Sequence, residues 1–254
     1  MIDIADYPTL LFVLASVTLW LSARCGALVR KRYPLDEEMR QDFSVLLGAA
    51  LTLLGLIIGF SFSMAAGRYD QRKNLEEAEA NAIGTEYMRA ALLPAADAAK
   101  LRPLLKSYLD QRVLFYTIHE DQQLGEINAR TAKLQAELWS AVLVPAAAAP
   151  TPIVGLAVSG MNDVLNAQGY TQAAWWNRIP TSAWCLMAVI ATCCNFLVGY
   201  GSRSASTASR LLYIFPLFIS VALAFIGDID SPRHGVIRVQ PQNLISLAAS
   251  LPGS

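Results

Sequence analysis

Four long apolar stretches without a charged residue constrain this chain more than any other feature of its sequence. They cover residues 7–23, 43–66, 179–201 and 211–227, and none contains Asp, Glu, Lys or Arg. A bilayer core of about 30 Å is crossed by roughly 20 helical residues. In lipid every backbone donor and acceptor must be paired within its own segment, so each stretch is predicted to be helical from end to end. The sequence therefore predicts an all-α protein with four transmembrane helices.

The spacing of the stretches predicts four parts along the chain. Residues 1–66 hold the first two spans, residues 67–178 form a soluble helical insert, residues 179–227 hold the last two spans, and residues 228–254 form a C-terminal tail. An even number of spans places both termini and the insert on the same side of the membrane. The insert carries 11 basic and 12 acidic residues. It has no basic surface for a nucleic acid, which is excluded as a partner.

The second span is predicted to continue as a helix into the insert. No proline occurs between Phe43 and Leu93, and Pro94 ends the helix after 51 residues, about 75 Å at 1.5 Å per residue. Apolar residues at helical spacing predict further helices, and the proline-rich segment 145–152 is interpreted as a loop before a last helix near residues 153–166. The insert is thus predicted to be an antiparallel helical bundle without strands.

Two stripes of the second span are candidates for a functional surface. The first consists of small residues, and the last four of them are four positions apart: Gly48, Gly55, Gly59, Ser63 and Gly67. Such a stripe lets two helices pack closely, and it can also line a conduit. The second stripe is bulky and apolar: Leu54, Ile58 and Phe62. Several copies of it could form a constriction that gates by dewetting, or it could contact lipid and the protein core.

Polar and aromatic residues near the span ends suggest further roles. Three cations follow the second span and could concentrate anions at a pore mouth, or form a solvated, salt-paired helix face: Arg68, Arg72 and Lys73. Trp175 and Trp176 precede the third span and suit an interfacial belt. Asn195 lies within that span, and its amide is predicted to bond across a helix interface.

Several motifs resemble those of the bestrophin-like membrane protein family, bacterial proteins related to bestrophin anion channels. They are the glycine-rich second span, RYD at residues 68–70, NAIGTEYMRA at 81–90, RIP at 178–180 and DIDSPRHG at 228–235. The resemblance covers nearly the whole chain. It implies a homopentamer in the inner membrane, with the insert in the cytoplasm and a second helix that lines one axial pore. Small anions such as chloride are the implied cargo.

The resemblance also suggests residues for a pore and for a metal. Leu54, Ile58 and Phe62 look like the apolar neck of bestrophin channels; a shift by one residue would place Gly55, Gly59 and Ser63 on the axis instead, which gives a polar lining without a neck. Asp228 and Asp230 resemble in position an acidic segment that binds calcium. Because calcium takes about six to eight oxygen ligands, carbonyls or waters would have to complete such a site.

No enzyme is predicted, since the sequence has no phosphate-binding glycine loop, metalloprotease helix or nucleophile elbow. Apart from calcium, no cofactor is expected. The alternative to a channel is a nonconducting membrane sensor or scaffold, in which the long second helix carries membrane or partner state into the insert.

Overall fold

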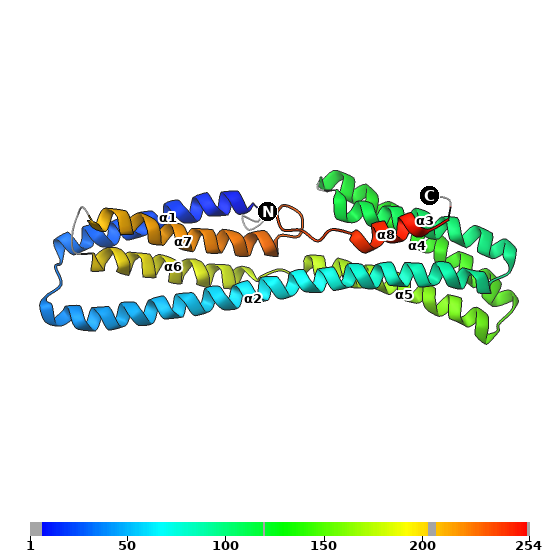
Figure 1. The fold of residues 1–254 in the computed structure, drawn as a ribbon, viewed down its shortest axis with the longest axis horizontal. Helices are drawn as coiled ribbons and strands as arrows, with labels where there is room; N and C mark the ends of the chain where they lie inside the picture. The colour runs from blue at the N-terminus through cyan, green and yellow to red at the C-terminus, as the bar shows by residue number, and fades with distance from the viewer. Residues whose placement is uncertain (1–6, 119, 203–206, 253–254) are drawn as a thin grey trace. The chain divides into compact units, whose positions relative to one another are not determined.

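The structure is a computed structural model that describes residues 7–118, 120–202 and 207–252. Its elements follow in this order: α1 (Pro8–Arg32), α2 (Glu37–Arg89), the short 3-10 helix η2 (Ala90–Leu92), α3 (Ala95–Thr117), α4 (Asp121–Ala148), α5 (Pro152–Trp176), α6 (Thr181–Gly201), α7 (Thr207–Asp230) and α8 (Gln242–Ser250) (Figure 1). No strand occurs in the described ranges. The all-α prediction is confirmed.

Within the described residues, four helical segments are long and apolar enough to cross a membrane, as the sequence predicted. They are Pro8–Arg32, Glu37–Leu92, Pro152–Gly201 and Leu212–Asp230, and each overlaps one of the predicted apolar stretches. The second is the long helix expected from the absence of proline. It begins at Glu37, earlier than predicted, and α2 gives way to η2 just before Pro94.

The chain divides into two compact units. We call the first the membrane unit, Met1–Tyr69 with Arg178–Arg238, and the second the insert unit, Asp70–Asn177 with Val239–Ser254. Helix α2 contributes residues to both. The predicted tail is shared in the same way, because its residues up to Arg238 belong to the membrane unit whereas α8 belongs to the insert unit.

In the membrane unit, α1 packs closely along α6. Ser22 Oγ donates to Thr192 O at 2.8 Å and Arg30 Nη1 donates to Tyr200 O at 3.0 Å, both across 170 positions, so the two helices run parallel. The approach depends on glycine, because a Cβ on Gly199 would overlap the carbonyl of Ala23. Small residues that let backbones approach are a main source of helix association in lipid.

Asn195 does not bond across this interface as predicted. Its Nδ2 donates to Ala191 O, one turn earlier in α6, at 2.8 Å. Asn195 is nevertheless fully buried. A short amide side chain can reach the carbonyl of its own preceding turn, and this local bond replaces the expected bond to another helix.

The insert unit is a helical bundle with an apolar core, to which α3, α4 and α5 all contribute. Its buried residues include Leu101, Leu105, Leu109 and Phe115 of α3, and Leu138, Val142, Met161 and Val164 of α4 and α5. The loop predicted over residues 145–152 is confined to residues 149–151, because α4 continues through Pro145 to Ala148 and α5 begins at Pro152. The alanines after Pro145 are strong helix formers and extend the helix.

The last helix of the insert is also longer than predicted. Helix α5 starts at Pro152, where Thr151 caps it by accepting the Val154 N–H at 3.3 Å, and ends at Trp176. Proline suits this first position because its missing donor is not needed there. Trp175 is buried between the rings of Phe115 and Tyr116, which corrects its predicted place in an interfacial belt.

Candidate functional site

Helix α2 is held in the membrane unit by one buried face. Leu54 is 1% exposed and packs with Leu19, Ala191 and Cys194, and Ala65 packs with Ile179, Ile226 and Ile229. Ile58 is half-buried and contacts both clusters. These contacts fix which side of α2 points into its own subunit.

The predicted neck stripe therefore does not lie in one environment. Leu54 is buried inside the subunit and cannot line an axial pore, which corrects that prediction. Ile58 is half-buried, whereas Phe62 is 41% exposed and stacks on Phe225 with ring centroids 5.9 Å apart. Residues four positions apart drift around a helix, so a stripe that starts in the core ends near the surface.

The small-residue stripe of α2 is open. An added Cβ at Gly48, Gly55, Gly59 or Gly67 would meet nothing within 4 Å among the described atoms, and Ser63 is exposed. Close packing within the subunit is thus not what the stripe is used for. Its neighbours must be lipid, another subunit or the water of a pore.

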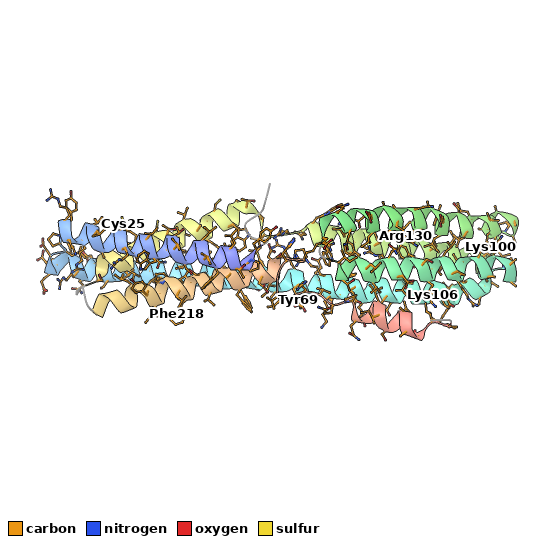
Figure 2. All side chains as sticks on the ribbon, turned by 90° about the horizontal axis from the view of Figure 1, so that it is seen from above. Cys25, Tyr69, Lys100, Lys106, Arg130 and Phe218 are labelled. Atoms are coloured by element: carbon orange, nitrogen blue, oxygen red, sulfur yellow. The ribbon has the colours of Figure 1, made fainter. Side chains whose placement is uncertain are left out.

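A third face of α2 carries large apolar side chains that point away from the core. These are Leu46, Leu53, Phe60 and Met64. Phe218 on α7 is similarly exposed (Figure 2). Such side chains match the hydrocarbon of a bilayer or an apolar subunit contact, and they distinguish this face from the small-residue stripe.

Two of the three predicted pore-mouth cations are engaged by other groups. Arg72 is 1% exposed, and its guanidinium donates to Ala174 O at 3.3 Å and to Asn177 O at 3.4 Å. Arg68 Nη1 lies 3.7 Å from Asp230 Oδ1. Lys73 alone of the three is exposed. The prediction of a pore-mouth role for Arg72 is corrected, because burial removes its charge from the surface.

The two aspartates considered for calcium are held by donors of the protein. Asp228 Oδ1 accepts the Val236 N–H at 2.6 Å and Oδ2 accepts the Ile237 N–H at 2.8 Å. Asp230 accepts the Ile179 N–H at 3.0 Å through Oδ2, and Arg178 Nε lies 3.9 Å from the same oxygen. The Asp228 carboxylate thereby fixes the segment that follows α7, and the Asp230 carboxylate fixes the residues that precede α6.

These surroundings do not fit calcium. The guanidinium groups of Arg68 and Arg178 supply the positive charge beside Asp230 that a cation would supply. Within the described parts of the chain, no group of three or more His, Cys, Asp or Glu side chains is placed to hold a metal ion.

The insert unit contains a buried polar cluster that sequence reasoning missed. Arg112 of α3 donates through Nε to Glu79 Oε1 and through Nη2 to Oε2 at 3.4 Å, and both side chains are fully buried. Thr171 of α5 donates to the same carboxylate at 3.2 Å. Burial and the negative charge of Glu79 raise the pKa of Tyr108 and of Tyr116 above the ordinary value. The cluster joins α2, α3 and α5.

A second carboxylate of α2 holds the C-terminal helix. Glu76 Oε1 accepts the N–H groups of Asn243 and Leu244 at 3.0 Å, and Oε2 accepts Asn243 Nδ2 at 2.6 Å. A carboxylate at a helix N-terminus satisfies donors that have no partner within the helix. Glu76 therefore caps α8 and fixes it beside α2.

A sequence signal for these carboxylates did exist. Buried positions of α2 and the following η2 in the insert recur at spacings of four and three residues, and they include Arg72, Glu76, Glu79, Ile83, Glu86 and Ala90. This is the spacing of a core-facing stripe, and four of its six members are ionisable. Charges at core positions indicate partners on neighbouring helices.

The fold defines a class: an all-α membrane protein with four candidate spans and a helical unit inserted between the second and third. The model of the bestrophin-like domain matches residues 10–244, and the chain belongs to this family. The comparison with curated proteins gives no match.

Solved structures agree with this assignment at the level of the fold. A variant of a bacterial bestrophin homologue from Klebsiella pneumoniae superposes with a TM-score of 0.66 at 13% identity, over 94% of this chain and 99% of that one. A second structure of the bacterial homologue from that organism gives a TM-score of 0.60 at 15% identity, over 95% and 98%.

Proposed function

We propose that the protein is an oligomeric channel for small anions, with chloride as the simplest cargo, and that the small-residue stripe of α2 lines its axial pore. The observation that carries the proposal is the open stripe, which lies on a different side of α2 from the buried face. Gly55 and Gly59 have no neighbour in the subunit, whereas Leu54 anchors the helix on its buried face. Membership of the bestrophin-like family supports conduction, and a homopentamer is the assembly that the family resemblance implies.

With the small-residue stripe of α2 on the axis, the pore lining differs in size and polarity from the predicted apolar neck. With Gly55, Gly59 and Ser63 on the axis, the lining is small and partly polar, and no ring of bulky side chains closes it by dewetting. Because no charged residue lies within the span, selectivity would come from pore width and the partial charges of helix ends. Lys73, exposed beyond the span, is the remaining candidate among the predicted cations to concentrate anions.

We further propose that the protein lies in the inner membrane, with the insert and both termini in the cytoplasm. The basic residues that flank the spans are nearly equal in number on the two sides, so the charge rule does not favour either orientation. Protease added to intact spheroplasts tests the orientation directly. Cleavage within the insert from outside the cell would contradict the proposal.

Cysteine accessibility in liposomes tests the pore lining. In a background without the four native cysteines, single cysteines replace Gly55, Gly59 or Ser63, and chloride flux is measured before and after a charged, membrane-impermeant thiol reagent. The reagent is expected to block flux through these three variants, because the added group lies in the conduction path. Leu53→Cys and Phe60→Cys are matched controls on the apolar face of the same helix, and their flux should not change.

Two results would overturn the proposal. Block of the Leu53 and Phe60 variants, with no block at the glycine positions, would mean that the apolar face of α2 lines the axis instead of the small-residue stripe. No flux from correctly assembled wild-type protein would favour the nonconducting sensor or scaffold. In that case the small-residue stripe would be a packing surface between subunits.

A further inference from the structure

Glu86 is a buried carboxyl without a hydrogen-bond partner among the described residues of the insert unit. Its side chain on α2 is 0% exposed, and neither Oε1 nor Oε2 has a hydrogen-bond partner in the structure. The other buried carboxylates of this helix differ in this respect. Glu76 is bonded to α8 and Glu79 to Arg112.

Glu86 faces α5 at a position where only glycine fits. A Cβ on Gly160 would overlap Glu86 Oε2 and Arg89 Nη1, so both side chains occupy the space beside that residue. Arg89 Nη1 also lies 3.9 Å from Asp163 Oδ2. Arg89 from α2 and Asp163 from α5 are the charged groups that act on Glu86. The 3-10 helix η2, which also packs against α5, contains only Ala and Leu.

This environment favours the protonated form of Glu86. An ionised carboxylate that is buried without a donor loses its hydration and gains nothing in return. Burial raises the pKa of Glu86 from 4.5 to about 8; Arg89 opposes the shift and Asp163 adds to it. At neutral pH the side chain is therefore mainly a neutral acid.

We propose that Glu86 is a proton-binding site and that its ionisation moves Arg89 from Asp163 to Glu86. Loss of the proton to solvent leaves a carboxylate close to Arg89 Nη1, which needs only a small side-chain movement to pair with it. Asp163 then loses its cation, and the α2–α5 contact at Gly160 changes its polar pairing. The site thus couples pH to the contact between α2 and α5.

Infrared titration of the purified full chain in detergent tests proton binding directly. A protonated carboxyl has a carbonyl band that disappears on ionisation. The wild type should lose one such band with a midpoint near pH 8. Glu86→Gln should lack this band, whereas Glu77→Gln, at an exposed position of the same helix, should keep it. A wild-type spectrum without a band of this midpoint, or a band that persists in Glu86→Gln, would refute the proposal.

The partner exchange is tested with wild-type Glu86 in place, so the result does not depend on how Glu86→Gln folds. Asp163→Asn should lower the midpoint, because Arg89 is released and a nearby negative charge is removed. Arg89→Gln should raise it, because the carboxylate loses its new partner. Unchanged midpoints in both variants would show that Glu86 binds a proton without this exchange of partners. That result would overturn the proposed movement of Arg89.

Thermal unfolding gives an independent measure. The pKa of Glu86 is higher in the folded chain than the 4.5 of an unperturbed Glu, so its contribution to stability is complete at low pH and is lost as pH rises through about 8. Between pH 4.5 and about 8, the melting temperature of the wild type should fall more steeply than that of Glu86→Gln. Equal slopes would contradict the inference.

Any effect of Glu86 ionisation on conduction rests on the proposed channel function. Because α2 contributes to both units, chloride flux should depend on pH near 8 in the wild type and less so in Glu86→Gln. Absent flux would count against the channel only, since the infrared midpoint reports Glu86 regardless of transport.

Discussion

Truncation of Leu54 to alanine separates a core role from a pore role at this position. The side chain is 1% exposed and packs with Leu19, Ala191 and Cys194. In soluble proteins Leu→Ala in a core costs about 2.7–5.0 kcal/mol, of which the lower limit approximates transfer from water and the remainder grows with the cavity. Lipid is as apolar as leucine, so the transfer part largely disappears in a membrane. The cavity part remains, and we expect a loss of about 1–2 kcal/mol.

Two measurements on the same samples distinguish a core role of Leu54 from a pore role. Unfolding of the detergent-solubilised protein gives the stability change, and chloride efflux from liposomes gives the rate per assembled oligomer. Leu54→Ala should be less stable than the wild type with an unchanged efflux rate. Leu53→Ala, which truncates an exposed neighbour, should leave both quantities near the wild-type values. Faster efflux from Leu54→Ala with unchanged stability would mean that Leu54 forms a neck, and the assignment of the α2 faces would be wrong.

Two further substitutions test the packing of each unit. Arg112→Met leaves the buried Glu79 carboxylate with Thr171 as its one remaining donor among the described residues and should cost about 3–5 kcal/mol in chemical unfolding. A double variant that also replaces Glu79 by Met should recover much of this loss. Gly199→Ala places a methyl group against the Ala23 carbonyl and should cost about 1–3 kcal/mol, while Gly59→Ala, which meets no neighbour in the subunit, should unfold like the wild type.

The sequence predicted the helical architecture well, because the bilayer imposes a simple rule on composition and length. Charge-free stretches marked the spans, and the absence of proline before Pro94 predicted the long α2. The errors occurred where local chemistry opposed a general rule. Pro145 was interpreted as a helix breaker, yet the alanines that follow it continue α4. Trp175 looked like an interfacial residue because it precedes a span, but its ring completes an aromatic cluster of the insert.

Partners distant in the sequence were the least predictable part of the candidate sites. Asp228 and Asp230 looked like metal ligands because they resemble in position an acidic segment of bestrophin channels that binds calcium, a cation whose positive charge balances the carboxylates. Arg68, distant from Asp230 in the chain, and Arg178 supply that charge, and only the fold brings them together. The close contact of α1 with α6 was missed for a similar reason: Gly26 and Gly199 are isolated glycines and form no stripe in either helix.

The faces of α2 were ambiguous for a physical reason. In a soluble helix the hydrophobic face is the buried one, but in lipid the outer face is apolar as well. Leu54, Leu53 and Phe60 are therefore equivalent in hydropathy, although the first lies in the core and the other two on the surface. A one-residue shift rotates the assignment by about 100° and exchanges Leu54 for Gly55. Contacts of α2 with α1, α6 and α7 distinguish the two registers, and those contacts leave the glycine stripe without a neighbour inside the described subunit.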